Sequence, residues 1–159
     1  MSHAATPGGY AATPIQKTAL VFGIVFLIVG IAGFIPGLTH SAEHLHAAGA
    51  DSEAHLLGIF QVSVLHNIVH LVFAVLGLAL AARARASRYY LIVGGLVYLL
   101  VWVYGLIAVT NSDINVLPVN HADNWLHLGL AVVMVLLGLF VGRDRRVQTA
   151  RPGTAPVAR

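Results

Sequence analysis

Four long apolar stretches constrain the fold of this sequence more than any other feature. They cover residues 18–38, 56–82, 89–109 and 125–141. Each is close to the ~20 residues with which an α-helix crosses ~30 Å of hydrocarbon. Only 9% of the 159 residues are charged and 58% are hydrophobic, whereas soluble domains carry about 25% charge. The sequence therefore predicts an all-α, four-helix transmembrane bundle that is embedded in membrane lipid.

The connections between the stretches predict how the helices are arranged. Those between the second, third and fourth stretches are short, which favours antiparallel neighbours and an up-down-up-down bundle. We expect the membrane domain to cover residues 17–142. The flanking residues 1–16 and 143–159 are polar and contain glycine and proline, so they are predicted to be disordered tails, the second of them basic.

The basic residues predict the orientation of the bundle. If the stretches alternate in direction, the Lys and Arg residues beside them all lie at one end: Lys17, Arg83, Arg85, Arg88, Arg143, Arg145 and Arg146. The connections at the other end contain no Lys or Arg. The positive-inside rule then places both termini in the cytoplasm of a multi-pass protein of the bacterial plasma membrane. Membrane topology explains the net charge of +3, so we expect no nucleic-acid partner.

The end that lacks basic residues is acidic and rich in histidine. Its connections carry five carboxylates and five imidazoles: Glu43, Asp51, Glu53, Asp113, Asp123, His40, His44, His46, His55 and His121. Such side chains suit Zn²⁺, Ni²⁺ or Cu²⁺, but a short solvated helix would have the same composition. We interpret this end as an exposed acidic outer face. The chain has no cysteine, which excludes disulfides, Fe–S clusters and thiolate metal sites.

Polar side chains also interrupt the second and fourth stretches. His66 and His70 are four residues apart and share one helix face with Asn67, while His127 and Asn124 lie in the fourth stretch. The spacing of HNIVH is similar to that of the zinc-protease helix HExxH, but an asparagine replaces the catalytic glutamate, which excludes that reaction. We predict that these five residues form an intramembrane polar cluster. Its imidazoles are functional candidates, or else neutral groups that fix helix register.

Small residues and apparent repeats predict how the helices pack. Gly23, Gly30 and Gly37 recur every seven residues and favour close helix packing. An offset of 61 pairs His66 with His127, and an offset of 71 pairs Gly23 with Gly94. These matches could come from an internal duplication or from chance similarity between apolar sequences, and both interpretations stay open.

Two polar motifs resemble those of a known family. They read HNxVH at residues 66–70 and NxADNxLH at residues 120–127. The segments around them resemble a family of small four-helix bacterial membrane proteins catalogued as a domain of unknown function, over roughly residues 17–142. The resemblance implies the four-span topology and family membership. It implies no catalytic residue.

These observations favour a function without catalysis. No nucleophile, phosphate loop or acid pair stands out as a sequence motif, so we expect a non-enzymatic integral membrane protein. Its expected role is an accessory or envelope-associated subunit that presents the acidic, His-rich outer face to a partner or to pH. The partner would be another membrane protein or a second copy. The alternative is a redox or metal-binding membrane protein in which His66, His70 and His127 hold haem or a transition metal. Without that alternative we expect no cofactor.

Overall fold

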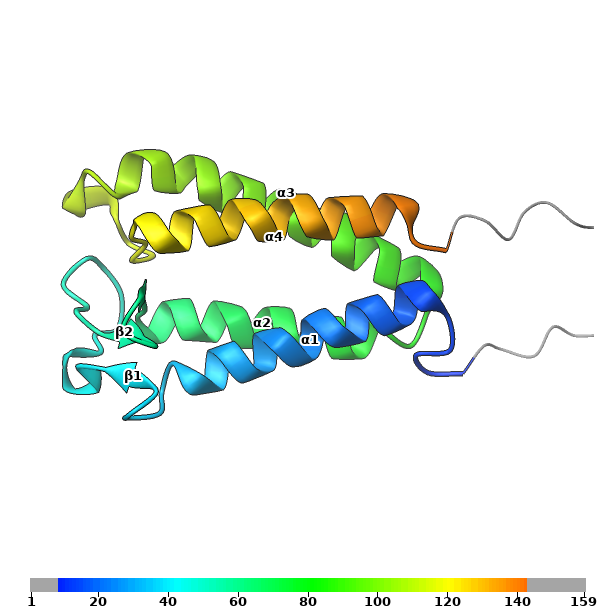
Figure 1. Cartoon of the computed structure of the whole chain (residues 1–159), viewed down its shortest axis with the longest axis horizontal. Coiled ribbons are helices and arrows are strands. Elements are labelled where there is room, and N and C mark those ends of the chain that lie inside the picture. Colours follow the sequence, from blue (N-terminus) through cyan, green and yellow to red (C-terminus); the bar gives the residue numbers. More distant parts are fainter. Residues whose placement is uncertain (1–8, 143–159) are drawn as a thin grey trace, which may run out of the picture.

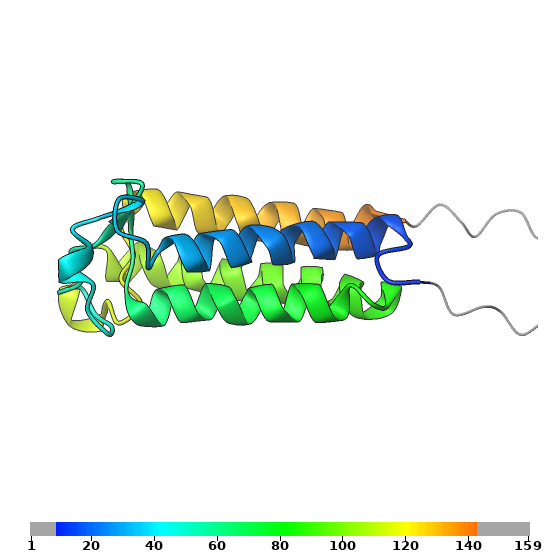
Figure 2. The ribbon, with the colours of Figure 1, turned by 90° about the horizontal axis from the view of Figure 1, so that it is seen from below.

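The computed structural model describes residues 9–142, which form a bundle of four helices. The helices are α1 (Pro14–Ala32), α2 (Val64–Leu80), α3 (Ala84–Ala108) and α4 (His121–Phe140). They run alternately up and down, so both ends of the described chain lie at one end of the bundle (Figure 1). Helix α1 packs mainly on α2, and α3 packs mainly on α4, so the bundle consists of two hairpins (Figure 2). The predicted four-helix fold is confirmed; residues 1–8 and 143–159 of the predicted tails lie outside the described residues.

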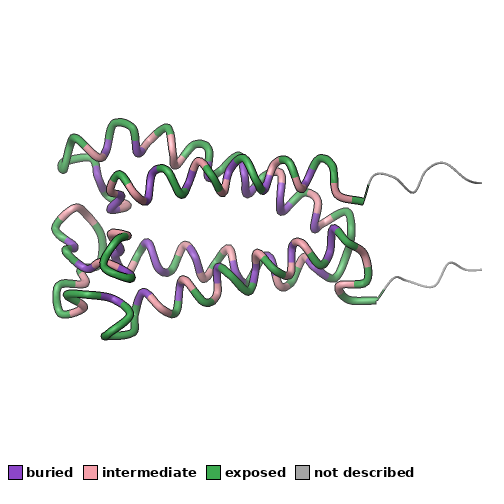
Figure 3. Tube along the Cα trace, viewed as in Figure 1, coloured by how far each residue is buried: buried purple, intermediate pink, exposed green. Residues whose placement is uncertain are grey.

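The surface of the bundle suits a membrane. Helices α1, α3 and α4 are long and apolar enough to span one, and α2 is a shorter apolar helix of 17 residues. Buried positions face the interior while exposed positions face outward (Figure 3). Many of the exposed residues are large and apolar, among them Ile28, Val75, Leu100 and Phe140. Such a surface is stable in lipid but not in water.

Helix α1 starts and ends earlier than predicted. It begins at Pro14, inside the predicted tail 1–16, because Thr13 and Gln16 form a capping box there. The helix ends at Ala32 rather than at residue 38. Turns follow it and include Gly37, which has a φ of +94°. Gly37 therefore does not belong to the predicted helical row of glycines.

Helix α2 starts later than predicted. The predicted stretch 56–82 begins with two strands, β2 (His55–Leu56) and β3 (Phe60–Gln61), which pair with β1 (Thr39–His40) in an antiparallel sheet of order β1-β2-β3. A tight turn joins β2 to β3 through Leu57 and Gly58, both with positive φ. The helix starts only at Val64, after its N-cap residue Ser63.

Residues 33–63 form a folded structure over one end of the bundle, and we call them the cap. The cap has its own small core of Ala54, Leu56 and Val62, which packs on Val29 and Ala32 of α1. A short 3-10 helix, Ala42–His44, precedes the sheet strands β2 and β3. The cap is therefore an ordered part of the fold.

The two hairpins are related by an internal repeat. The N-cap residues Ser63 of α2 and Asn120 of α4 are 57 residues apart, and each side chain accepts a hydrogen bond from the third residue after it. The residues of α2 and α4 that pack on two equivalent glycines are also 57 residues apart. Gly23 lies against the backbone of Ala74 and Leu78, while Gly95, 72 residues later, lies against that of Ala131 and Val135.

The repeat also relates three further contacts. Asn67 lies against Gly33, and Asn124 lies against Gly105. Gln16 donates to the carbonyl of Ala81 at the end of α2, and Arg88 donates to that of Gly138 at the end of α4. The equivalent residues Phe26 and Tyr98 stack on each other, with ring centroids 5.5 Å apart.

These contacts show a structural repeat of the two hairpins, in a register that differs from the predicted one. The offsets are 72 between α1 and α3 and 57 between α2 and α4, not 71 and 61. His127 is therefore equivalent to His70, and the position equivalent to His66 is Asp123. Equivalent residues meet only near a symmetry axis, so the stacked pair of Phe26 and Tyr98 lies close to the pseudo-twofold axis of the bundle.

Candidate functional site

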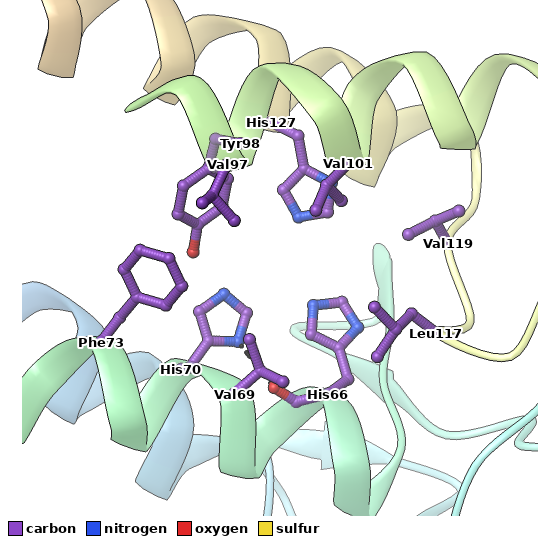
Figure 4. Close-up of a pocket in the computed structure, with 10 residues that line it drawn as sticks. All are labelled: His66, Val69, His70, Phe73, Val97, Tyr98, Val101, Leu117, Val119 and His127. Carbon is purple, nitrogen blue, oxygen red and sulfur yellow. Dashed lines mark hydrogen bonds between the residues drawn. The ribbon is translucent and has the colours of Figure 1, made fainter. Parts of the chain in front are cut away.

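A small cavity lies between the two hairpins just below the cap. Its volume is about 40 Å³, enough for about two or three water molecules. Its walls come from α2, α3, α4 and the connection before α4, and the lining residues are His66, Val69, His70, Phe73, Val97, Tyr98, Val101, Leu117, Val119 and His127 (Figure 4).

Three imidazoles from two helices face one another across this cavity (Figure 4). The rings of His66 and His70 stack with centroids 4.8 Å apart, and those of His66 and His127 are 5.9 Å apart. All three residues are buried. Tyr98 completes the group, 5.4 Å from His127 between ring centroids. The predicted juxtaposition of the three histidines is therefore present.

Backbone carbonyl groups determine which ring nitrogen carries the proton in His66 and His70. The Nδ1 atom of His66 is 3.2 Å from the carbonyl oxygen of Pro118, and that of His70 is 3.2 Å from the carbonyl oxygen of His66. A carbonyl can only accept, so in the neutral rings Nδ1 carries the proton and Nε2 has a free lone pair. Metal-binding histidines are commonly oriented in this way.

His127 differs from the other two histidines. Its Nδ1 atom is buried and has no hydrogen-bond partner within residues 9–142. A buried polar atom without a partner is costly and usually points to a missing ligand, ion or water. The ring packs against those of His66 and Tyr98, so its unpaired nitrogen is the polar atom of the site that a ligand or a water molecule could satisfy.

The two asparagines of the predicted cluster do not line the cavity. Asn67 and Asn124 are buried, but their amides pack on Gly33 of α1 and Gly105 of α3. The side-chain oxygen of each lacks a hydrogen-bond partner in the described part of the chain. The structure thus separates the five predicted residues into three cavity histidines and two asparagines at helix contacts.

The cap displays most of the predicted outer-face residues. His40, His44 and His46 are exposed, as are the carboxylates Glu43 and Glu53. His44 lies 3.9 Å from each of these two carboxylates. The cap therefore presents imidazoles and carboxylates side by side.

Asp123 is an exception to the predicted outer face, because it is buried. Its carboxylate accepts hydrogen bonds from the backbone N–H groups of Gln61 in β3 and of Asn120, at 2.9 and 3.1 Å. It therefore ties the cap of the first hairpin to the start of α4 in the second. The capping-box spacing of Asn120 and Asp123 is a sequence signal for the bond to Asn120, but it does not indicate the bond to Gln61.

Other parts of the site had no readable signal in the sequence. The carbonyl of Pro118 orients His66 from 52 residues away, and a backbone group leaves no trace in a side-chain pattern. Leu117 and Val119 close the cavity from a connection that has no helical periodicity.

The fold and the site together define a class of protein: a four-helix membrane bundle with a folded cap and a buried histidine cavity. Within that class, the chain belongs to the family described as "Domain of unknown function (DUF4383)", whose profile matches residues 16–140. This confirms the resemblance seen in the sequence. No curated protein and no solved structure matches the chain.

Proposed function

We propose that this protein is a non-enzymatic, multi-pass subunit of the bacterial plasma membrane that binds an envelope partner through its cap. The observation that supports this is the size and order of the cap. Antiparallel helices need a connection of only about 2 to 8 residues, and residues 81–83 suffice between α2 and α3. The first hairpin instead uses residues 33–63, which fold around a core of their own. Long ordered connections are common sites of recognition.

The position of the cap on the second hairpin supports a recognition role. The backbone N–H of Gly49 donates to the carbonyl of Val116 at 2.8 Å, and the Asn120 amide donates to the carbonyl of Ile59 at 2.7 Å. These bonds and the Asp123 contacts hold the cap rigidly. A rigid surface loses little conformational entropy when it binds a partner.

The charge pattern supports an orientation for the cap. Arg83, Arg85 and Arg88 lie at the opposite end of the bundle, beside the start of α3. The cap itself contains no Lys or Arg. By the positive-inside rule the cap faces outward and both termini face the cytoplasm. We propose a membrane protein of the envelope, or a second copy of this chain, as its partner.

Single-cysteine variants test the orientation and the partner together, because the natural chain has no cysteine. Glu53→Cys in the exposed part of the cap should react in intact cells with a membrane-impermeant maleimide cross-linker. Ala82→Cys, exposed at the opposite end, should react only after the cells are opened. The cross-linker on Glu53→Cys should then capture one discrete protein in high yield. Labelling of Ala82→Cys from outside would contradict the orientation, and capture of lipid alone would contradict the partner.

A second candidate function, metal binding, is favoured by the free Nε2 lone pairs of His66 and His70. Among the described residues no group of three or more His, Cys, Asp or Glu is already arranged to hold a metal ion. The His127 ring, whose Nδ1 atom has no hydrogen-bond partner among these residues, would have to reorient to complete a set of three. Haem does not fit, because cofactor pockets measure roughly 300–1,000 Å³ and this cavity about 40 Å³.

We expect metal binding, if this second function holds, to depend on the cavity and not on the cap. Purified protein should take up about one Zn²⁺ or Cu²⁺ per chain, and His70→Leu should weaken that binding by about tenfold or more. His44→Leu is the matched control, because it removes an exposed imidazole from the cap. Elemental analysis of dialysed samples measures the stoichiometry. Equal loss in both variants, or no uptake by the natural chain, would rule out the cavity as a metal site.

A further inference from the structure

A second cavity lies at the other end of the bundle. Helices α1 and α3 begin at this end and α4 ends there (Figure 2). The volume of the cavity is about 260 Å³. The residues that line it are Thr13, Pro14, Ile15, Ala84, Arg85, Arg88 and Gly142. The cavity therefore lies at the boundary between the apolar helices and the medium outside the membrane, with two arginines in its wall.

The internal repeat shows that these arginine charges are not needed for the fold. Residues 85 and 88 are equivalent to Thr13 and Gln16 of the first hairpin, which are uncharged. Gln16 closes the end of α2 by donating to the carbonyl of Ala81 at 2.9 Å. Arg88 does the same at the end of α4, where it also donates to the carbonyl of Val141 at 2.8 Å. A neutral amide is thus sufficient for this structural role, and the positive charge at position 88 is additional.

The second arginine has no ion-pair partner in the described part of the chain. Arg85 lies over the ring of Tyr89, with 5.7 Å between the guanidinium carbon and the ring centroid, and it is exposed. Among residues 9–142, no carboxylate lines the cavity. The part of the wall that these residues form therefore carries two positive charges without a negative one.

The start of α3 adds to this positive character, while the carbonyls at the end of α4, beside the same cavity, accept hydrogen bonds from Arg88. Thr13 and Gln16 cap α1, but Arg83 at the N-cap of α3 makes no side-chain hydrogen bond to the helix. Ala84 and Arg85, the first residues of α3, line the cavity. The partial positive charge of a helix start favours an anion beside it.

We propose that this cavity binds the phosphate group of an anionic phospholipid. Basic pockets between transmembrane helices at the membrane boundary suit such headgroups, and guanidinium groups are well matched to phosphate oxygens. The volume is below the roughly 300 Å³ at which pockets for whole drug-sized ligands begin, so it suits a headgroup whose acyl chains lie along the apolar helices. A soluble phosphate compound would share the chemistry of the headgroup but would not need the membrane boundary.

Lipid retention by the full-length protein tests this proposal. The protein is reconstituted with equal amounts of phosphatidylglycerol and phosphatidylcholine and extracted in mild detergent, and native mass spectrometry counts the lipids that remain bound. We expect retention of phosphatidylglycerol over phosphatidylcholine. Arg85→Gln and Arg88→Gln should each reduce that preference about fivefold. Arg88→Gln keeps an amide for the α4 carbonyls, as Gln16 does for α2, and Arg85 is exposed, so both variants should fold.

The matched control is Arg83→Gln, which removes the same charge two residues away from a position outside the cavity wall. It should leave the lipid preference unchanged. An equal loss in Arg83→Gln, or equal retention of both lipids by the natural chain, would overturn the proposal. Displacement of phosphatidylglycerol by millimolar inorganic phosphate would overturn the lipid assignment in favour of a soluble phosphate ligand.

Discussion

Gly23→Ala is expected to force α1 away from α2 and to lower the stability of the bundle. A Cβ atom at this position would lie 2.8 Å from the backbone nitrogen of Leu78 and 3.0 Å from the backbone carbon of Gly77. Backbone atoms cannot move aside as a flexible side chain can. Overpacking of this kind typically costs 1–3 kcal/mol, so we expect a loss of about that size. The thermal unfolding midpoint in detergent measures it.

The glycine equivalent to Gly23 in the second hairpin offers a second test of close helix packing, and an unpacked glycine of α4 offers a control. Gly95→Ala should cost a similar amount, because its Cβ would lie 3.0 Å from both the Ala131 oxygen and the Val135 nitrogen. Gly129→Ala, in the middle of α4, should be neutral or stabilising, since nothing lies within 4 Å of its Cβ position and alanine favours helix formation. A Gly23→Ala protein as stable as the natural chain would show that the hairpin does not depend on this close approach.

Asp123→Ala is expected to detach the cap from the second hairpin. The substitution leaves the N–H groups of Gln61 and Asn120 without their acceptor, one from β3 and one from the start of α4. A buried donor left without its acceptor costs about 1–3 kcal/mol, so for the two N–H groups we expect a total loss of about 2–6 kcal/mol. Hydrogen exchange should show faster exchange at residues 54–62, before the helices themselves open.

Two further variants distinguish the loss of the Asp123 hydrogen bonds from the mere loss of a negative charge. Asp123→Asn keeps one acceptor oxygen and should lose only part of the stability. Asp113→Ala removes an exposed carboxylate from the connection between α3 and α4 and should leave exchange in the cap unchanged. If Asp123→Ala leaves the cap as protected as in the natural chain, the core of Ala54, Leu56 and Val62 alone holds it in place.

Hydropathy was sufficient to predict the four helices because membrane-spanning segments must bury all their backbone polar groups internally. It failed at the cap end, where apolar residues such as Leu56, Phe60 and Val62 belong to strands and to the cap core. Strands of two residues form through pairing with distant partners, here Thr39 with Leu56. Local periodicity cannot show such pairing, although Pro36 and Gly37 were available as signals for the end of α1.

The candidate site was predictable in part for a similar reason. His66 and His70 share a helix face by spacing alone, and the structure places His127 opposite them. The repeat register was wrong because leucine and glycine matches in apolar sequence outweighed a few polar ones. The correct register is visible in the pattern of an asparagine followed by a histidine three residues later, at Asn67 and His70 and at Asn124 and His127.

The repeat provides a way to read natural variation in this family. At some positions both halves have the same small residue, such as Gly23 and Gly95, and these residues hold the helices together. A substitution at such a position should destabilise the bundle equally in either half. Positions where the halves have diverged separate what was inherited from what was added later. His66 opposite Asp123, and Arg88 opposite Gln16, are such pairs. An ancestral pair of identical hairpins would have had the same residue at both positions, so these departures from symmetry mark where the two halves acquired separate tasks.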